Sequence, residues 1–126
     1  MKKEATTVLD EHDLEIVNIL TELGMPKNSA KTLVFLYQIG RETKSTEIEQ
    51  GAKLRQPEVS VAMDYLKKKG NWVEKEPKKK EGKGRPIHAY KLAVSGSKIV
   101  KTLEADAQAK IKEIEENIKK LKKFMK

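Results

Sequence analysis

The chain has 126 residues, of which 37% are hydrophobic and 37% are charged, so it can form one small domain with a solvated extension. It has no cysteine, which excludes disulfides and thiolate metal sites. No apolar run approaches the roughly 20 residues that span a bilayer, and the charged N-terminus lacks a signal-peptide core. We therefore expect a cytoplasmic protein.

The net charge of +8 is unevenly distributed along the chain. Residues 1–24 hold two lysines and six acidic residues, a net charge of −4. Residues 25–72, 73–94 and 95–126 each carry a net charge of +4. A polyanionic partner suits this distribution, although a lysine-rich surface that only aids solubility has the same composition.

Two helices are predicted in the first 40 residues. The first starts at residue 10 or 13 and ends at residue 23, and its apolar residues cover more than one stripe. We expect it to contact both the domain core and a second subunit, with Ile16 and Leu20 in the dimer interface. Asn28 or Ser29 caps the second helix, which ends before the next glycine. Its predicted core stripe is Ala30, Leu33, Val34 and Tyr37.

A helix-turn-helix pattern follows. Residues 45–52 form its first predicted helix, in which Thr46 and Glu49 have the spacing of a capping box. Residues 53–56 form the turn. The second helix, residues 57–69, begins at a proline, as suits a first helical position, and ends at a glycine after three lysines. Its predicted buried face is Val59, Ala62, Met63 and Leu66.

A hairpin is predicted after the second helix of this pattern. Its strands are residues 72–76 and 87–93, and its loop, residues 77–86, is rich in lysine and glycine. Residues 41–44 have the composition of a polar connection, so the hairpin is the whole predicted sheet. This order predicts a mainly α fold with a small β-hairpin, a winged helix-turn-helix domain over residues 25–94.

The last predicted helix runs from Ser95 or Ser97 almost to the C-terminus. We expect residues 95–126 to form a coiled-coil-like dimerisation helix, and residues 1–24 to form a separate N-terminal extension and helix. A second copy of the chain is the simplest partner for the apolar seam of the last helix. The predicted seam is Val100, Ala107, Ile111, Ile114, Ile118, Leu121 and Met125.

Three segments resemble a known group of proteins. Residues 45–48 and 59–70 resemble winged-helix transcriptional regulators of the TrmB-like, MarR-like and ArsR-like kinds, and residues 84–92 are similar to the wing-to-strand return of the TrmB-like group. The resemblance implies a homodimer that binds operator DNA, with residues 57–69 as recognition helix. The chain lacks the cysteines of an ArsR-type metal site and the large effector domain of TrmB-like sugar sensors, so any small-molecule effector is unknown.

Residues near the start of the recognition helix are the expected readers of base edges. Arg55 suits guanine, Gln56 suits adenine, and Glu58 suits a cytosine amino group. The alternative is a solvated helix surface, on which Asp64 pairs with Lys68 one turn away. The expected base-contacting set is Arg55, Gln56, Glu58, Ser60 and Val61, and Pro57 is expected beside them on the DNA-binding side of the helix.

Phosphate contacts are expected at two further places. The N-terminus of the helix over residues 45–52 presents backbone N–H groups, which bind phosphate well. The wing adds cations that can follow a duplex backbone. The alternatives are an ordinary capped helix and a solvated loop whose lysines prevent edge aggregation. The expected residues are Arg41, Lys44, Ser45 and Thr46 at the helix, and Lys78, Lys79, Lys80, Lys83 and Arg85 in the wing.

Nothing in the sequence favours catalysis. The two histidines, His12 and His88, lie far apart without a clustered set of partners, and no nucleophile–base set is evident. We expect no enzyme activity, cofactor or metal, and we expect double-stranded DNA and a second copy of the chain as partners. The alternatives are a protein-interaction winged helix within a larger assembly and a basic protein that binds nucleic acid without sequence preference.

Overall fold

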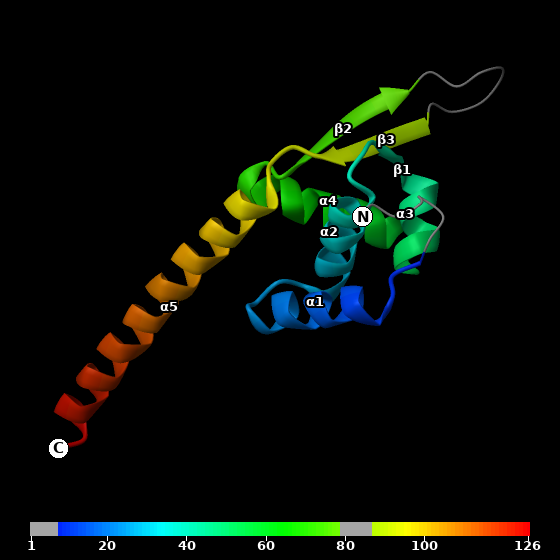
Figure 1. Ribbon diagram of the computed structural model, residues 1–126. Coiled ribbons are helices and arrows are strands. Elements are labelled where there is room, and N and C mark those ends of the chain that lie inside the picture. The colour runs from blue at the N-terminus through cyan, green and yellow to red at the C-terminus, as the bar shows by residue number, and fades with distance from the viewer. Residues whose placement is uncertain (1–7, 79–86) are drawn as a thin grey trace. The chain divides into compact units, whose positions relative to one another are not determined.

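Five helices and three strands make up the part of the chain that the structure, a computed structural model, describes: residues 8–78 and 87–126. They are α1 (Glu11–Glu22), α2 (Lys27–Ile39), β1 (Thr43–Lys44), α3 (Ser45–Ala52), α4 (Gln56–Gly70), β2 (Val73–Lys78), β3 (Ile87–Leu92) and α5 (Gly96–Phe124) (Figure 1). The predicted class, a mainly helical winged-helix fold with a long C-terminal helix, is confirmed, with one added strand. The chain divides into two units, Met1–Val94 and Ser95–Lys126. The further division after residue 24 stays a prediction.

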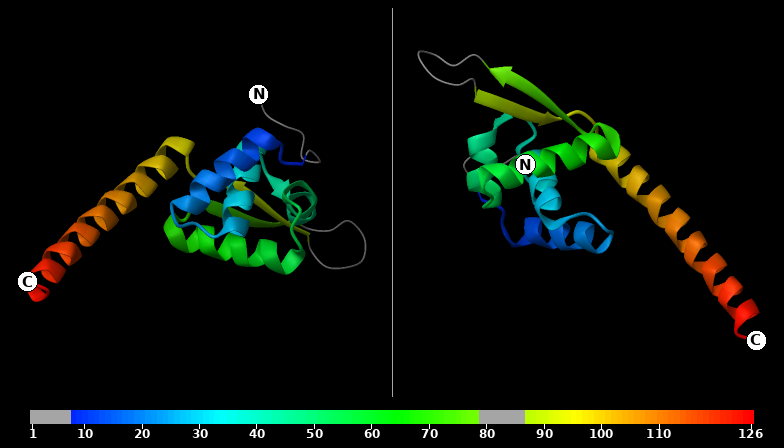
Figure 2. Two further views of the ribbon diagram at one scale, coloured as in Figure 1. Left: turned by 90° about the horizontal axis from the view of Figure 1, so that it is seen from below. Right: turned by 180° about the vertical axis from the view of Figure 1, so that it is seen from behind.

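Helix α2 is the centre of the first unit. It contacts α1, α3, α4 and β3 (Figures 1 and 2). Because neighbours surround it, its burial extends beyond one stripe: Phe35 and Leu36 are buried, whereas Tyr37 is 54% exposed and was wrongly predicted in the core. The predicted cap is also wrong, since α2 begins at Lys27 and Ser29 is a buried residue within the helix.

The helix-turn-helix is held tightly against α2. Gly51 of α3 lies so close to Phe35 that a Cβ there would stand 2.0 Å from Cε1 of the ring. The turn then reverses through Lys53, which has a left-handed φ of 56°, and the next residue, Leu54, is buried. Helix α4 buries Val59, Ala62, Met63 and Leu66, which confirms the predicted face. Each fully buried aliphatic side chain contributes about 1.5–3 kcal/mol relative to exposure.

The sheet has three antiparallel strands in the order β1-β3-β2. Strand β1 was missed by the sequence analysis, which treated its residues as a connection; Thr43 pairs with Tyr90 of β3. Strand β2 runs to Lys78, two residues beyond its predicted end, and β3 ends at Leu92. Between α4 and β2, Asn71 adopts a left-handed φ of 58° and ends the helix. The fully buried Trp72 follows it at the start of the sheet.

Helix α5 forms the second unit. Ser95 caps it by accepting a hydrogen bond from the Lys98 backbone N–H at 3.2 Å, so of the two predicted caps it is the one used. At about 1.5 Å per residue, its 29 residues span about 43 Å. Its seam side chains are exposed, apart from the intermediate Ala107: Val100, Ile111, Ile114, Ile118, Leu121 and Met125. Among the described residues, no helix combines the length and apolar content needed to cross a membrane.

Candidate nucleic-acid interface

Helices α3 and α4 begin in the same way. Lys44 precedes α3, and its backbone N–H donates to Glu47 Oε1 at 2.9 Å. Arg55 precedes α4, and its backbone N–H donates to Glu58 Oε1 at 2.8 Å. The predicted capping box of Thr46 with Glu49 is therefore wrong: the N-cap is Lys44, two residues before Thr46, so Glu47 occupies the position that reaches back.

Both of these glutamates also face an arginine. Arg41 Nη2 lies 3.8 Å from Glu47 Oε2, and Arg41 Nη1 donates to the Glu42 carbonyl at 2.8 Å. Arg55 Nε lies 3.7 Å from Glu58 Oε1. Such exposed pairs contribute little stability, but they offset the negative charge that the glutamates place at the helix starts. At the start of each helix, a glutamate oxygen thus accepts a hydrogen bond from the backbone, and an arginine side chain beside it faces solvent.

The Glu58 carboxylate is engaged in holding the start of α4. The hydrogen bond from the Arg55 backbone is the largest cause that lowers the pKa of Glu58; desolvation opposes it, and the charges of Arg55 and Lys31 lower the pKa further. Glu58 therefore stays ionised near neutral pH. Both contacts to Arg55 use Oε1 of Glu58, and the expected contact of Glu58 with a cytosine amino group stays a prediction.

The outward face of α4 is open to solvent. Gln56, Pro57 and Ser60 are exposed, Val61 is 70% exposed, and the side chain of Arg55 is 86% exposed. On this face Lys68 Nζ lies 3.0 Å from Asp64 Oδ2, which confirms the predicted i,i+4 pair. Hydrogen-bonding and apolar groups at the start of α4 are thus available to a partner, while the helix is anchored through its buried side.

A hollow of about 390 Å³ separates this face from the sheet. Ser60, Asp64 and Lys67 of α4 line one side, and Lys75 and Tyr90 of the strands line the other. Burial raises the pKa of the Tyr90 hydroxyl, so it stays protonated and can donate. Lys67, Lys75 and Tyr90 were not among the predicted site residues; the antiparallel register that pairs Lys75 with Tyr90 is the signal that links those two.

The wing predictions rest on residues that the structure describes only at its edge. Lys78 is the last residue of β2. The remaining four expected contacts, Lys79, Lys80, Lys83 and Arg85, lie outside the described residues. Their role stays a prediction.

The predicted dimer residues on α1 divide into two kinds. Ile16 is half-buried, whereas Leu20 is only 9% exposed because it packs within its own chain, so it offers little surface to a second subunit. Leu14 and Ile19 of α1 and Leu23 just after it are also exposed apolar residues. The place of Ile16 and Leu20 in a dimer interface stays a prediction.

Comparison with known proteins gives a structural likeness. No protein-family model and no curated protein matches this chain. A solved structure from Methanosarcina mazei Go1, named "Possible transcriptional regulator", superposes with a TM-score of 0.64 over 85% of this chain and 87% of that chain, at 18% sequence identity. At this identity the likeness shows that the two chains share a fold.

Proposed function

We propose that this chain is a regulator of transcription that binds double-stranded DNA sequence-specifically as a homodimer. The observation that carries the proposal is the exposed start of α4. Its anchored helix presents Arg55, Gln56 and Ser60 to solvent, next to a second helix start of the same design at Lys44. A rigid helix with free polar side chains at its N-terminal end is what major-groove reading requires.

The described residues support different roles at this surface. Arg55 and Gln56 are proposed to read guanine and adenine, and Val61 to contact a thymine methyl group. Arg41, Lys44, Ser45 and Thr46 at the start of α3 are proposed to hold a phosphate. Glu58 is a positioning residue here, because it binds the Arg55 backbone and lies beside its side chain.

Helix α5 supports the homodimer. Ile111, Ile114, Ile118 and Leu121 recur at coiled-coil spacing and are each about half exposed. An apolar stripe of this length is buried when a partner helix with the same stripe packs against it, and closed twofold pairs are the commonest solution. A dimer carries two α4 helices, as two half-sites one turn of DNA apart require.

Selection of duplexes from a random pool by the full chain tests this function. Enrichment of an inverted repeat with half-sites about 10 base pairs apart is the expected outcome. Binding without enrichment of any motif would favour the basic protein of low sequence preference. The absence of duplex binding would favour a protein-interaction winged helix.

A further inference from the structure

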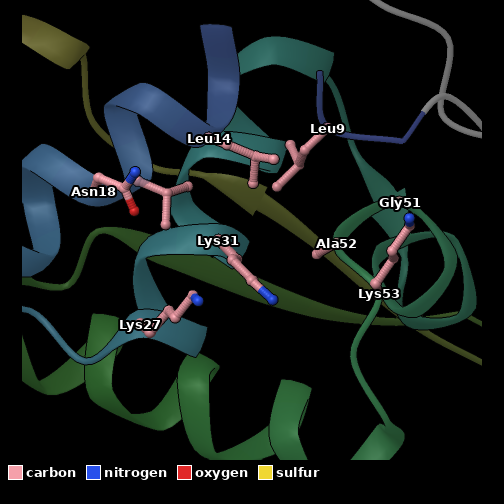
Figure 3. Close-up of a pocket in the computed structure, with 9 residues that line it drawn as sticks. Leu9, Leu14, Asn18, Lys27, Lys31, Gly51, Ala52 and Lys53 are labelled. Carbon is pink, nitrogen blue, oxygen red and sulfur yellow. The ribbon is translucent and has the colours of Figure 1, made fainter. Parts of the chain in front are cut away.

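A second hollow of the first unit lies away from the sheet, between α1, the start of α2 and the end of α3 (Figure 3). Its volume is about 390 Å³, within the range of about 300–1,000 Å³ that is usual for small-molecule sites. The residues that line it come from three elements and the turn after α3. None of the assigned roles above uses this cavity.

The cavity has an apolar side that is fixed in place. Val17 and Ala52 are buried lining residues, and the side chains of Leu9 and Leu14 lie close to each other at the cavity (Figure 3). The backbone N–H of Leu9 donates to the Gly51 carbonyl at 3.0 Å, which fastens the segment before α1 to the end of α3. This side is therefore preformed rather than assembled by a ligand.

The opposite side of the cavity is cationic. Lys27 and Lys31, one turn apart on α2, extend from the side facing Leu9 and Leu14 (Figure 3), and Lys53 follows from the turn. Among the described residues that line the cavity, none is acidic. The start of α2 adds to this potential, because its first turn has no acidic residue and its N-cap supplies no side-chain acceptor. Three lysines around one hollow repel each other and attract an anion.

We propose that this cavity binds a small organic anion, a carboxylate or phosphate joined to an apolar body of one or two rings. The head group lies between Lys27 and Lys31, and the rings pack against Leu14, Val17 and Ala52. Charge complementarity selects the head group, and the apolar side selects the body.

The position of the cavity suggests how a ligand would act, and this step rests on the proposed function. Lys53 belongs to the turn that leads into α4, and Lys31 is one of the charges that lower the pKa of Glu58 at the start of that helix. A ligand in this cavity would therefore lie beside the turn that leads into the proposed recognition helix.

The binding claim is tested without DNA. The full chain, labelled with ¹⁵N, is titrated with 2-naphthoate, 2-naphthyl phosphate and the neutral naphthalene-2-carboxamide, and amide shifts are followed. We expect saturable shifts at Val17 and Ala52, with a Kd on the order of 1 mM for a fragment of this size. The carboxamide should bind about tenfold more weakly than the better anion, and the two anions distinguish the head groups.

Paired variants locate the site. Lys27→Gln combined with Lys31→Gln should weaken anion binding about tenfold or more. Lys98→Gln combined with Lys101→Gln, which removes the same charge from α5, should leave it unchanged. Circular dichroism shows whether both double variants fold. A separate variant, Leu14→Gln at a partly exposed position, tests the apolar side of the cavity.

Three results would overturn the proposal: no saturable shifts at millimolar ligand, a carboxamide that binds as tightly as the anions, or unchanged affinity in the Lys27 and Lys31 variant. If the same variant instead loses duplex affinity while no anion binds, the lysines belong to a DNA surface. Because the titration contains no DNA, its failure leaves the proposed function standing, and failure of duplex binding leaves the titration interpretable.

Discussion

Replacing Gly51 by alanine tests how the close contact of α3 with α2 holds the helix-turn-helix. The added Cβ would stand 2.0 Å from Cε1 of Phe35 and 2.5 Å from Cζ, where ordinary contacts are 3.4–4 Å. Phe35 is 1% exposed, so its ring has no solvent to move into. Either α3 shifts away from α2 or the core around Phe35 is strained.

The expected cost follows from these contacts. Overpacking a well-packed core costs about 1–3 kcal/mol, and the better helix propensity of alanine returns up to about 1 kcal/mol. We expect the free energy of unfolding to fall by about 1–2 kcal/mol. For a domain of this size that lowers Tm by about 4–16 °C.

Trp72 provides the assay, because it is the single tryptophan of the chain and is fully buried in the same unit. Its fluorescence is followed during thermal unfolding of Gly51→Ala and of Gln50→Ala, a control at the exposed neighbouring position that should stay within about 0.5 kcal/mol. Adding Phe35→Leu to Gly51→Ala should recover part of the loss, as a positive coupling in a double-mutant cycle. Equal Tm values for wild type and Gly51→Ala would refute the close-contact argument.

Three further outcomes are expected. Arg55→Ala and Gln56→Ala should each reduce the preference for a selected duplex over a scrambled one by about 1–3 kcal/mol in fluorescence anisotropy titrations, the range for a bidentate base contact. Ile114→Asp combined with Ile118→Asp should sediment as a folded monomer that binds DNA weakly, because charges cannot pack in a coiled-coil seam. Since the pKa of Glu58 is lowered in the folded chain, its stabilising effect is present above its unfolded pKa and is lost as pH falls through the folded one. Glu58→Gln should therefore be less stable than wild type near neutral pH, and the difference should shrink as pH falls through the folded pKa of Glu58, measured by urea denaturation.

Each of these predictions has its own control. For the α4 variants, the control is Lys98→Ala on α5, which should leave the preference for the selected duplex unchanged. If Lys98→Ala lowered that preference as much as Arg55→Ala does, base reading could not be assigned to α4. Gln108→Asp combined with Asn117→Asp adds the same charge to α5 outside the seam and should remain dimeric. A wild-type chain that sediments as a monomer at micromolar concentration would contradict the homodimer. A pH-independent difference between wild type and Glu58→Gln would contradict the role given to the carboxylate.

Much of the fold could be predicted because apolar residues recur at a clear helical spacing in several elements. The buried face of α4 follows helical spacing, Leu54 is the one large apolar residue in the turn, and Ser95 stands at the start of a long amphipathic helix. The two-residue β1 could not be predicted, since it is too short to show alternation and depends on its pairing with β3.

The candidate site could be predicted from the sequence only in part. Thr46 with Glu49 and Lys44 with Glu47 offer rival starts for one helix, and the register of α3 decides between them. Leu20 and Ile19 are neighbours on a helix whose apolar residues cover more than one stripe, so only packing shows which one faces the core. The cavity beside Lys31 joins three elements that are distant in sequence, and no local pattern could indicate it.

Anisotropy titration of the full chain with its selected duplex and with a scrambled duplex, each at 50 and 200 mM salt, tests the central claim most directly. A dimer that makes 6–10 phosphate contacts should lose about 10³–10⁵ in affinity over this range, and at either salt it should bind the selected duplex about 10³-fold or more tightly than the scrambled one. Affinity that is nearly independent of salt, or equal for the two duplexes, would contradict sequence-specific DNA binding.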